Sequence, residues 1–116
     1  MIIDDSNVMR MTVSKTLTEA GYEVVEAVDG QDGLNKLKEN PVHLIICDIN
    51  MPVMDGISFL KEKRNLENSK FTPVIMLTTE SSQSKMLEGK EAGAKAWIIK
   101  PFDQDKLLYA VSKLLI

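Results

Sequence analysis

Five short apolar runs alternate with longer stretches of helical periodicity, and this alternation constrains the fold more than any other feature. Runs 44–47, 74–77 and 96–99 are apolar without alternation, which is typical of parallel strands covered on both faces. Run 22–28 carries two glutamates and predicts a wetter edge strand. The predicted strands cover residues 1–3, 22–28, 44–47, 74–77 and 96–99.

The stretches after these runs predict five helices. Asp29, Asp55 and Asp103 stand where a side chain would cap the second, third and fifth of them. The third should bury Ile57 and keep a charged outer face, whereas the fourth, over 84–92, has few apolar residues and should be weak or mobile. The pattern predicts an α/β fold of the (βα)5 class: a doubly wound five-stranded parallel sheet with helices on both faces.

Composition excludes several classes of function. Lys and Arg total 14 against 17 Asp and Glu, a net charge of -3, which argues against nucleic-acid binding. The single cysteine, Cys47, excludes an intrachain disulfide and a multi-cysteine metal site, and both Cys47 and the only histidine, His43, are interpreted as structural.

No run approaches the roughly 18 residues of a membrane span, and the acidic start is unlike a signal peptide. We expect one cytoplasmic domain over residues 1–116 with no direct membrane partner.

Candidate site residues follow four of the five runs, and the second run contributes none. Asp4 and Asp5 follow the first, Asp48 the third, Thr78 the fourth and Lys100 the fifth. The carboxyl ends of parallel strands share one edge, where such sheets bind ligands, so these side chains should converge. Two carboxylates about 4 Å apart repel by about 4 kcal/mol at an effective dielectric near 20, and Mg²⁺ would offset this repulsion. An aspartate there can accept a phosphoryl group, with Lys100 neutralising one phosphate oxygen and Thr78 donating to another.

Each of these residues also has a purely structural explanation. Asp4 and Asp5 could turn the chain and cap the first helix, and Asp48 could be a turn residue. Thr78 could be a cap, and Lys100 an ordinary solvated lysine. Their occurrence at four strand ends together favours a functional site.

The stretches Asp4-Asp5-Ser6, D-I-N-M-P-V-M-D-G at 48–56, Thr78 and Lys100-Pro101-Phe102 resemble a bacterial response-regulator receiver domain, of the stand-alone chemotaxis type. The resemblance covers essentially the whole chain. It implies the flavodoxin-like strand order 2-1-3-4-5, for which a chemotaxis member of this family is itself a standard example. It also implies a phosphorylation-activated switch in a two-component system, whose only reactions are its own phosphotransfer and autodephosphorylation.

The resemblance implies a role for each acidic residue. Asp48 would accept the phosphoryl group from the phosphohistidine of a sensor histidine kinase. Asp5 and Asp48 would ligate Mg²⁺ directly, Asp4 through a water, and Asn50 through its backbone carbonyl.

The resemblance extends to the later strand ends. Thr78 and Lys100 would hold phosphoryl oxygens, and Lys100-Pro101 would be a cis peptide, which is plausible for an X-Pro bond. Asn50 and Glu80 match positions that tune self-dephosphorylation in the family.

Trp97 falls where the family carries its switching aromatic residue, usually Tyr or Phe. One hypothesis is that phosphorylation draws Thr78 toward Asp48 and shifts Trp97 inward, reshaping the face of the fourth helix, fifth strand and fifth helix. The alternative is an edge-strand anchor that never moves. Thr79, where many stand-alone members have a small residue, could crowd the inward position.

Several alternatives stay open for the function. A stand-alone switch would bind a downstream protein such as a flagellar motor component. A receiver excised from a longer regulator with an output domain would look the same, and only three residues precede Asp4, which predicts a short first strand. A Mg²⁺-dependent phosphatase of the haloacid-dehalogenase type would need an aspartate where Asn50 stands. A nucleotide-binding module is set aside, because no glycine-rich phosphate loop is present.

Overall fold

The computed structural model describes residues 1–115, along which strands and helices alternate. The strands are β1 (Ile2–Ile3), β2 (Glu26–Ala27), β3 (Ile45–Cys47), β4 (Val74–Thr78) and β5 (Ala96–Ile99). The helices are α1 (Asn7–Glu19), α2 (Gly30–Leu37), α3 (Gly56–Lys63), α4 (Gln83–Glu91) and α5 (Gln104–Leu114).

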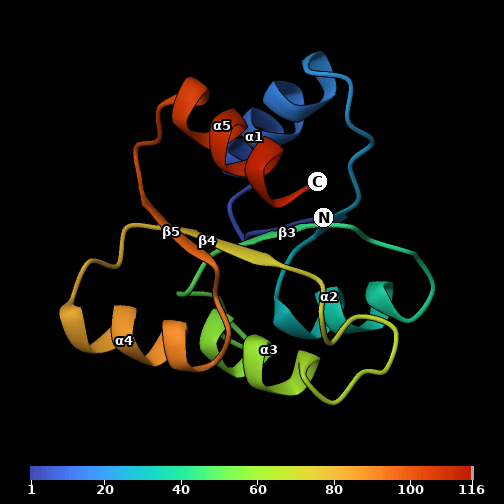
Figure 1. Ribbon diagram of the computed structural model, residues 1–116, viewed down its shortest axis with the longest axis vertical. Helices are drawn as coiled ribbons and strands as arrows, with labels where there is room; N and C mark the ends of the chain where they lie inside the picture. The colour runs from blue at the N-terminus through green and yellow to red at the C-terminus, as the bar shows by residue number, and fades with distance from the viewer. Residues whose placement is uncertain (116) are drawn as a thin grey trace.

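All strand pairs are parallel, and the sheet order is β2-β1-β3-β4-β5, as predicted. Helices α1 and α5 cover one face of the sheet, and α2, α3 and α4 cover the other (Figure 1). Each face of the sheet has its own hydrophobic core, and successive strand residues point into the two cores alternately. Ile46 and Ile75 pack in the core beneath α1 and α5, whereas Cys47 and Met76 pack in the core on the other face. Burial on both faces explains why the central runs are apolar without alternation.

The edge strand β2 is much shorter than its apolar run. Residues 22–28 were expected to be extended, but only Glu26 and Ala27 form a ladder. The reason is the partner: β1 offers only Ile2 and Ile3 for pairing. The edge position was therefore predicted correctly and the length was wrong.

Capping side chains begin the helices where the sequence predicted them. Asp29, Asp55 and Asp103 accept backbone N–H groups at the starts of α2, α3 and α5. The first helix differs, because its cap is Ser6, whose hydroxyl accepts from the Met9 N–H at 3.2 Å. The carboxylates that precede Ser6 do not cap the helix and lie at the edge of the sheet, although Asp4 Oδ1 also accepts the Ser6 N–H at 2.9 Å.

The third helix departs from expectation, whereas the fourth forms close to its expected bounds and its expected weakness stays a prediction. In α3, Lys63 does not lie on a charged outer face: it is buried and donates to the carbonyls of Ser69 (2.9 Å) and Lys70 (3.2 Å). The fourth helix, expected over 84–92, forms a regular helix over Gln83–Glu91 with Ser82 as its cap. Within residues 1–115, no helix is long and apolar enough to cross a membrane.

Candidate functional site

Three carboxylates meet at the carboxyl edge of the sheet. One oxygen each from Asp4, Asp5 and Asp48 lies within 4.8 Å of the others. Strand pairing explains this, because Ile3 and Cys47 are partners in the β1–β3 ladder and the residue after each strand is an aspartate. Asp4 and Asp48 are buried, whereas Asp5 is exposed, so the cluster opens to solvent on one side.

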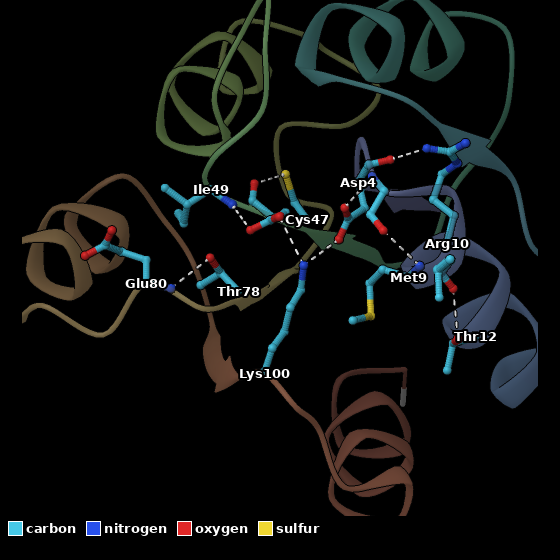
Figure 2. A network of polar contacts seen from close by, with 12 residues as sticks. Asp4, Met9, Arg10, Thr12, Cys47, Ile49, Thr78, Glu80 and Lys100 are labelled. Atoms are coloured by element: carbon cyan, nitrogen blue, oxygen red, sulfur yellow. Dashed lines mark hydrogen bonds and ion pairs between the residues drawn. The ribbon is translucent and has the colours of Figure 1, made fainter.

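Lys100, after β5, bridges the two buried carboxylates. Its Nζ lies 2.8 Å from Asp4 Oδ2 (Figure 2) and 3.1 Å from Asp48 Oδ2. Burial alone would lower the pKa of Lys100 and is the largest single effect, but the hydrogen bonds that its ammonium donates to both carboxylates, together with their negative charges, outweigh burial and raise the pKa. The ammonium therefore stays charged and offsets part of the negative charge. The following peptide bond, to Pro101, is cis, as expected.

The Asp48 carboxylate is held at both oxygens. Oδ1 accepts the Ile49 N–H at 2.7 Å, while Oδ2 faces Lys100. The backbone at Gly56 packs directly against the backbone of Asp48. A Cβ added to Gly56 would clash with the Asp48 carbonyl oxygen. The Gly56 N–H donates to the Ile49 carbonyl at 2.8 Å. Only glycine permits this approach, which gives the Asp-Gly pair at 55–56 a structural reason.

The Thr78 hydroxyl lies at the end of β4 and is fully buried. It accepts the Glu80 N–H at 3.1 Å (Figure 2), which leaves its own hydrogen available for donation. Hydrogen bonds from the side chain and backbone of Ser82, and a smaller contribution from Asn50, hold the pKa of Glu80 below its ordinary value. The structure thus brings together Asn50 and Glu80, the two residues assigned to dephosphorylation by resemblance.

Trp97 is half-buried on β5 and is tied to the loop after β4. Its indole N–H donates to the Glu80 carbonyl at 2.9 Å. Thr79 is exposed. Both interpretations of Trp97, a moving switch and a fixed anchor, stay predictions.

Sequence reasoning missed Arg10 on α1. Its Nη1 donates to the backbone carbonyl of Asp4 at 2.5 Å, and its Nε lies 3.5 Å from a Glu26 carboxylate oxygen. The side chain is only 11% exposed, so it brings a second positive charge to the acidic edge. The only available signal was a basic residue in the helix that follows two aspartates.

Cys47 packs as the small buried side chain expected of it, whereas the structural interpretation of His43 stays a prediction. The Cys47 thiol is fully buried and donates to the Asp48 carbonyl at 3.1 Å. Burial, followed by the charges of Asp48 and Asp4, raises the pKa of the Cys47 thiol, which keeps it protonated and unreactive. His43 is exposed just before β3, away from the acidic cluster at the other end of that strand.

Fold and site together define a doubly wound α/β protein with a lysine-bridged carboxylate cluster at the carboxyl edge of its sheet. The chain belongs to the response regulator receiver domain family, whose model matches residues 1–112. This assignment favours the signalling interpretation over the phosphatase and nucleotide-binding alternatives.

Relatives cover nearly the whole chain. The chemotaxis protein CheY of Bacillus subtilis is 40% identical over 99% of this chain and 95% of its own length. The structure of Vibrio cholerae CheY4 superposes with a TM-score of 0.93 at 46% identity, covering 98% of this chain and 95% of that one.

A further structure bears on the acidic cluster. The receiver domain of the Pseudomonas aeruginosa sensor histidine kinase PA1611 has a magnesium ion coordinated in its active-site cleft. It is 26% identical, with a TM-score of 0.90, and the match covers 98% of this chain and 93% of that one. In the present chain, three carboxylates within 4.8 Å form an all-oxygen donor set that suits the same kind of cation.

Proposed function

We propose that this chain is a phosphorylation-activated signalling switch that accepts a phosphoryl group on Asp48 from the phosphohistidine of a sensor histidine kinase. The observation that carries the proposal is the bridge from Lys100 to Asp4 and Asp48 at the edge of the sheet. A lysine that is largely shielded from solvent and lies between two carboxylates is a strong local charge arrangement, and such arrangements are common at functional sites.

The proposed step is a transfer at phosphorus. An oxygen of Asp48 forms a bond to phosphorus while the phosphorus–nitrogen bond of the donor breaks, and the histidine leaves with the bonding electrons. Lys100, which already contacts Asp48, neutralises an oxygen of the incoming group. The free hydrogen of the Thr78 hydroxyl donates to another oxygen. Catalysis is then positioning and charge neutralisation by groups held in place beforehand.

The carboxylates of Asp4, Asp5 and Asp48 would hold Mg²⁺, with Asp4 acting through a water and the backbone carbonyl of Asn50 completing the set. Bound Mg²⁺ would supply positive charge to the phosphoryl oxygens. Asn50 and Glu80, which lie together beside the pocket, would tune the loss of the phosphoryl group to water.

The signal would leave through the face formed by α4, β5 and α5, which would bind a downstream protein such as a flagellar motor component or an output protein. Chemotaxis relatives support this choice of partner class. We expect the exchange to occur in the cytoplasm, with no direct binding to nucleic acid or membrane. Residues 1–116 would act as one receiver domain, with no turnover of a separate substrate.

Acetyl phosphate, with and without Mg²⁺, tests the proposal by intact mass. The wild type and Asp105→Asn, a matched control on the exposed side of α5, should gain one phosphoryl group only when Mg²⁺ is present. Asp48→Asn should gain none. An unmodified wild type, under conditions that label a known receiver, would refute the proposed function.

A further inference from the structure

Helix α4 meets the body of the protein through a residue that has no side chain. Of residues Gln83–Glu91, all of which the structure describes, only Gly89 is buried. Glycine is among the poorest helix formers, so its place at the buried position of a short helix calls for a packing reason.

The packing reason is the Trp97 ring. A Cβ added to Gly89 would lie 2.6 Å from Trp97 Cζ3 and 3.4 Å from Ile57 Cδ1. The six-membered ring of the indole therefore occupies the space that an alanine side chain would need. Its other edge donates the indole N–H to the Glu80 carbonyl at 2.9 Å. A rigid ring held at both edges cannot move away from an added methyl group without losing this hydrogen bond.

Glu80 connects the ring to the proposed phosphoryl site. The Glu80 N–H donates to Thr78 Oγ1 at 3.1 Å (Figure 2), while its carbonyl accepts from Trp97. The backbone carbonyl of Thr78 accepts the Lys100 N–H at 2.9 Å. The segment from Thr78 to Glu80 is thus tied to β5 at both of its ends.

A displaced ring has a place to go. Trp97 borders a surface hollow of about 320 Å³, most of whose lining is apolar. The other lining residues are Met86, Leu87, Lys90, Ala94, Lys95 and Ala96. Displacement of the indole by added bulk at Gly89 would break its hydrogen bond to Glu80 and expose more of the ring at this hollow.

We propose that Gly89 is a positioning residue for the phosphoacceptor site. Because Gly89 has no side chain, the Trp97 ring packs directly against α4. In this position the ring donates its N–H to the Glu80 carbonyl, and the Glu80 N–H in turn positions the Thr78 hydroxyl. The packing link is independent of the function proposed above, whereas its effect on phosphorylation rests on that function.

A double-mutant cycle with Gly89→Ala and Trp97→Val tests the packing link, read by urea unfolding with circular dichroism. Alanine for glycine usually stabilises a helix, and Ser84→Ala at an exposed position of α4 reports the effect of alanine without a clash. In the wild type, Gly89→Ala should lower the folding equilibrium constant roughly fivefold or more. Without the ring, the same change should raise it. Additive effects would overturn the proposal.

Two further measurements test the positioning role. In Gly89→Ala, emission from Trp97, the only tryptophan, should shift to longer wavelength and become more accessible to acrylamide. Labelling of Asp48 by acetyl phosphate should slow several-fold in Gly89→Ala and in Trp97→Val, which keeps the test valid if the first variant folds poorly. Coupled stability with unchanged labelling rates would overturn the positioning role. A wild type that takes no phosphoryl group would instead refute the proposed function.

Discussion

Replacement of Lys100 by methionine tests whether one ammonium balances the acidic pocket. Its Nζ lies 2.8 Å from Asp4 Oδ2 and 3.1 Å from Asp48 Oδ2. The Asp4 side chain is 1% exposed and the Lys100 side chain 11%, so water compensates little for a lost partner. Methionine keeps most of the length and the apolar stem of lysine, so the substitution removes mainly the charge and its hydrogen bonds.

The geometry sets the expected magnitude. At 2.8 Å and an effective dielectric near 20, one such ion pair is worth about 6 kcal/mol before desolvation is counted. Desolvation cancels much of that energy, but removal of one partner from a buried pair typically costs about 3 to 5 kcal/mol. Because the pocket opens to solvent at Asp5, we expect the lower end, about 3 kcal/mol. The free energy of unfolding of a typical domain is about 5 to 15 kcal/mol, so this loss is a large part of it.

The assay is urea unfolding at pH 7 with EDTA, followed by circular dichroism. Lys106→Met, at an exposed position of α5, is the control and should change the free energy of unfolding by less than about 0.5 kcal/mol. Addition of millimolar MgCl₂ should shrink the loss in Lys100→Met, because a cation on the three carboxylates replaces the missing charge. An unfolding midpoint equal to that of the wild type in EDTA would refute the reasoning about charge balance. If Mg²⁺ raises the unfolding midpoint of neither the wild type nor Lys100→Met, the cation site is refuted.

Three further predictions concern stability. Val53 has a φ of 69° and is 81% exposed, so Val53→Asn should raise the free energy of unfolding by about 0.5 to 1 kcal/mol, because Asn tolerates the left-handed region better. A lower urea midpoint would contradict this expectation. Asp103→Ala should lower the free energy of unfolding by about 1 kcal/mol through loss of the cap of α5, whereas Asp103→Asn should keep most of it; equal losses in the two variants would show that the cap is not responsible. Burial, followed by the charge of Lys95, lowers the pKa of Lys63 from 10.5, so the unfolded chain binds more protons in the window just below that value. The urea midpoint of the wild type relative to Lys63→Met should therefore rise as the pH increases through this window, and a flat difference would count against a perturbed Lys63.

The acidic pocket could be predicted because it depends only on which residues follow the strands and on the strands being parallel. Asp48 follows an apolar run, Asp4 follows another, and Lys100 follows a third, so a parallel sheet leaves little choice about where they meet. The helix caps at Asp29 and Asp55 could also be predicted from the sequence, since a capping side chain accepts a hydrogen bond from a backbone N–H only two or three residues away.

Other features depend on contacts that no local pattern encodes. Lys63 lies among charged residues in the sequence, yet it turns inward because the carbonyls of the 69–70 loop need donors there. Arg10 reaches the Asp4 carbonyl only because α1 packs beside β1. The length of β2 was set by its short partner strand rather than by its own composition.

The sequence by itself determined the α/β class with its parallel sheet, most of the helix starts and the set of residues at the strand ends, because periodicity, capping and chain direction are local properties. The strand order came from the family resemblance. Only the tertiary structure decided that one lysine spans both Asp4 and Asp48, and that the Trp97 ring takes the space left by Gly89. Those outcomes depend on distances between segments far apart in the chain, which are set by how side chains pack and not by their order.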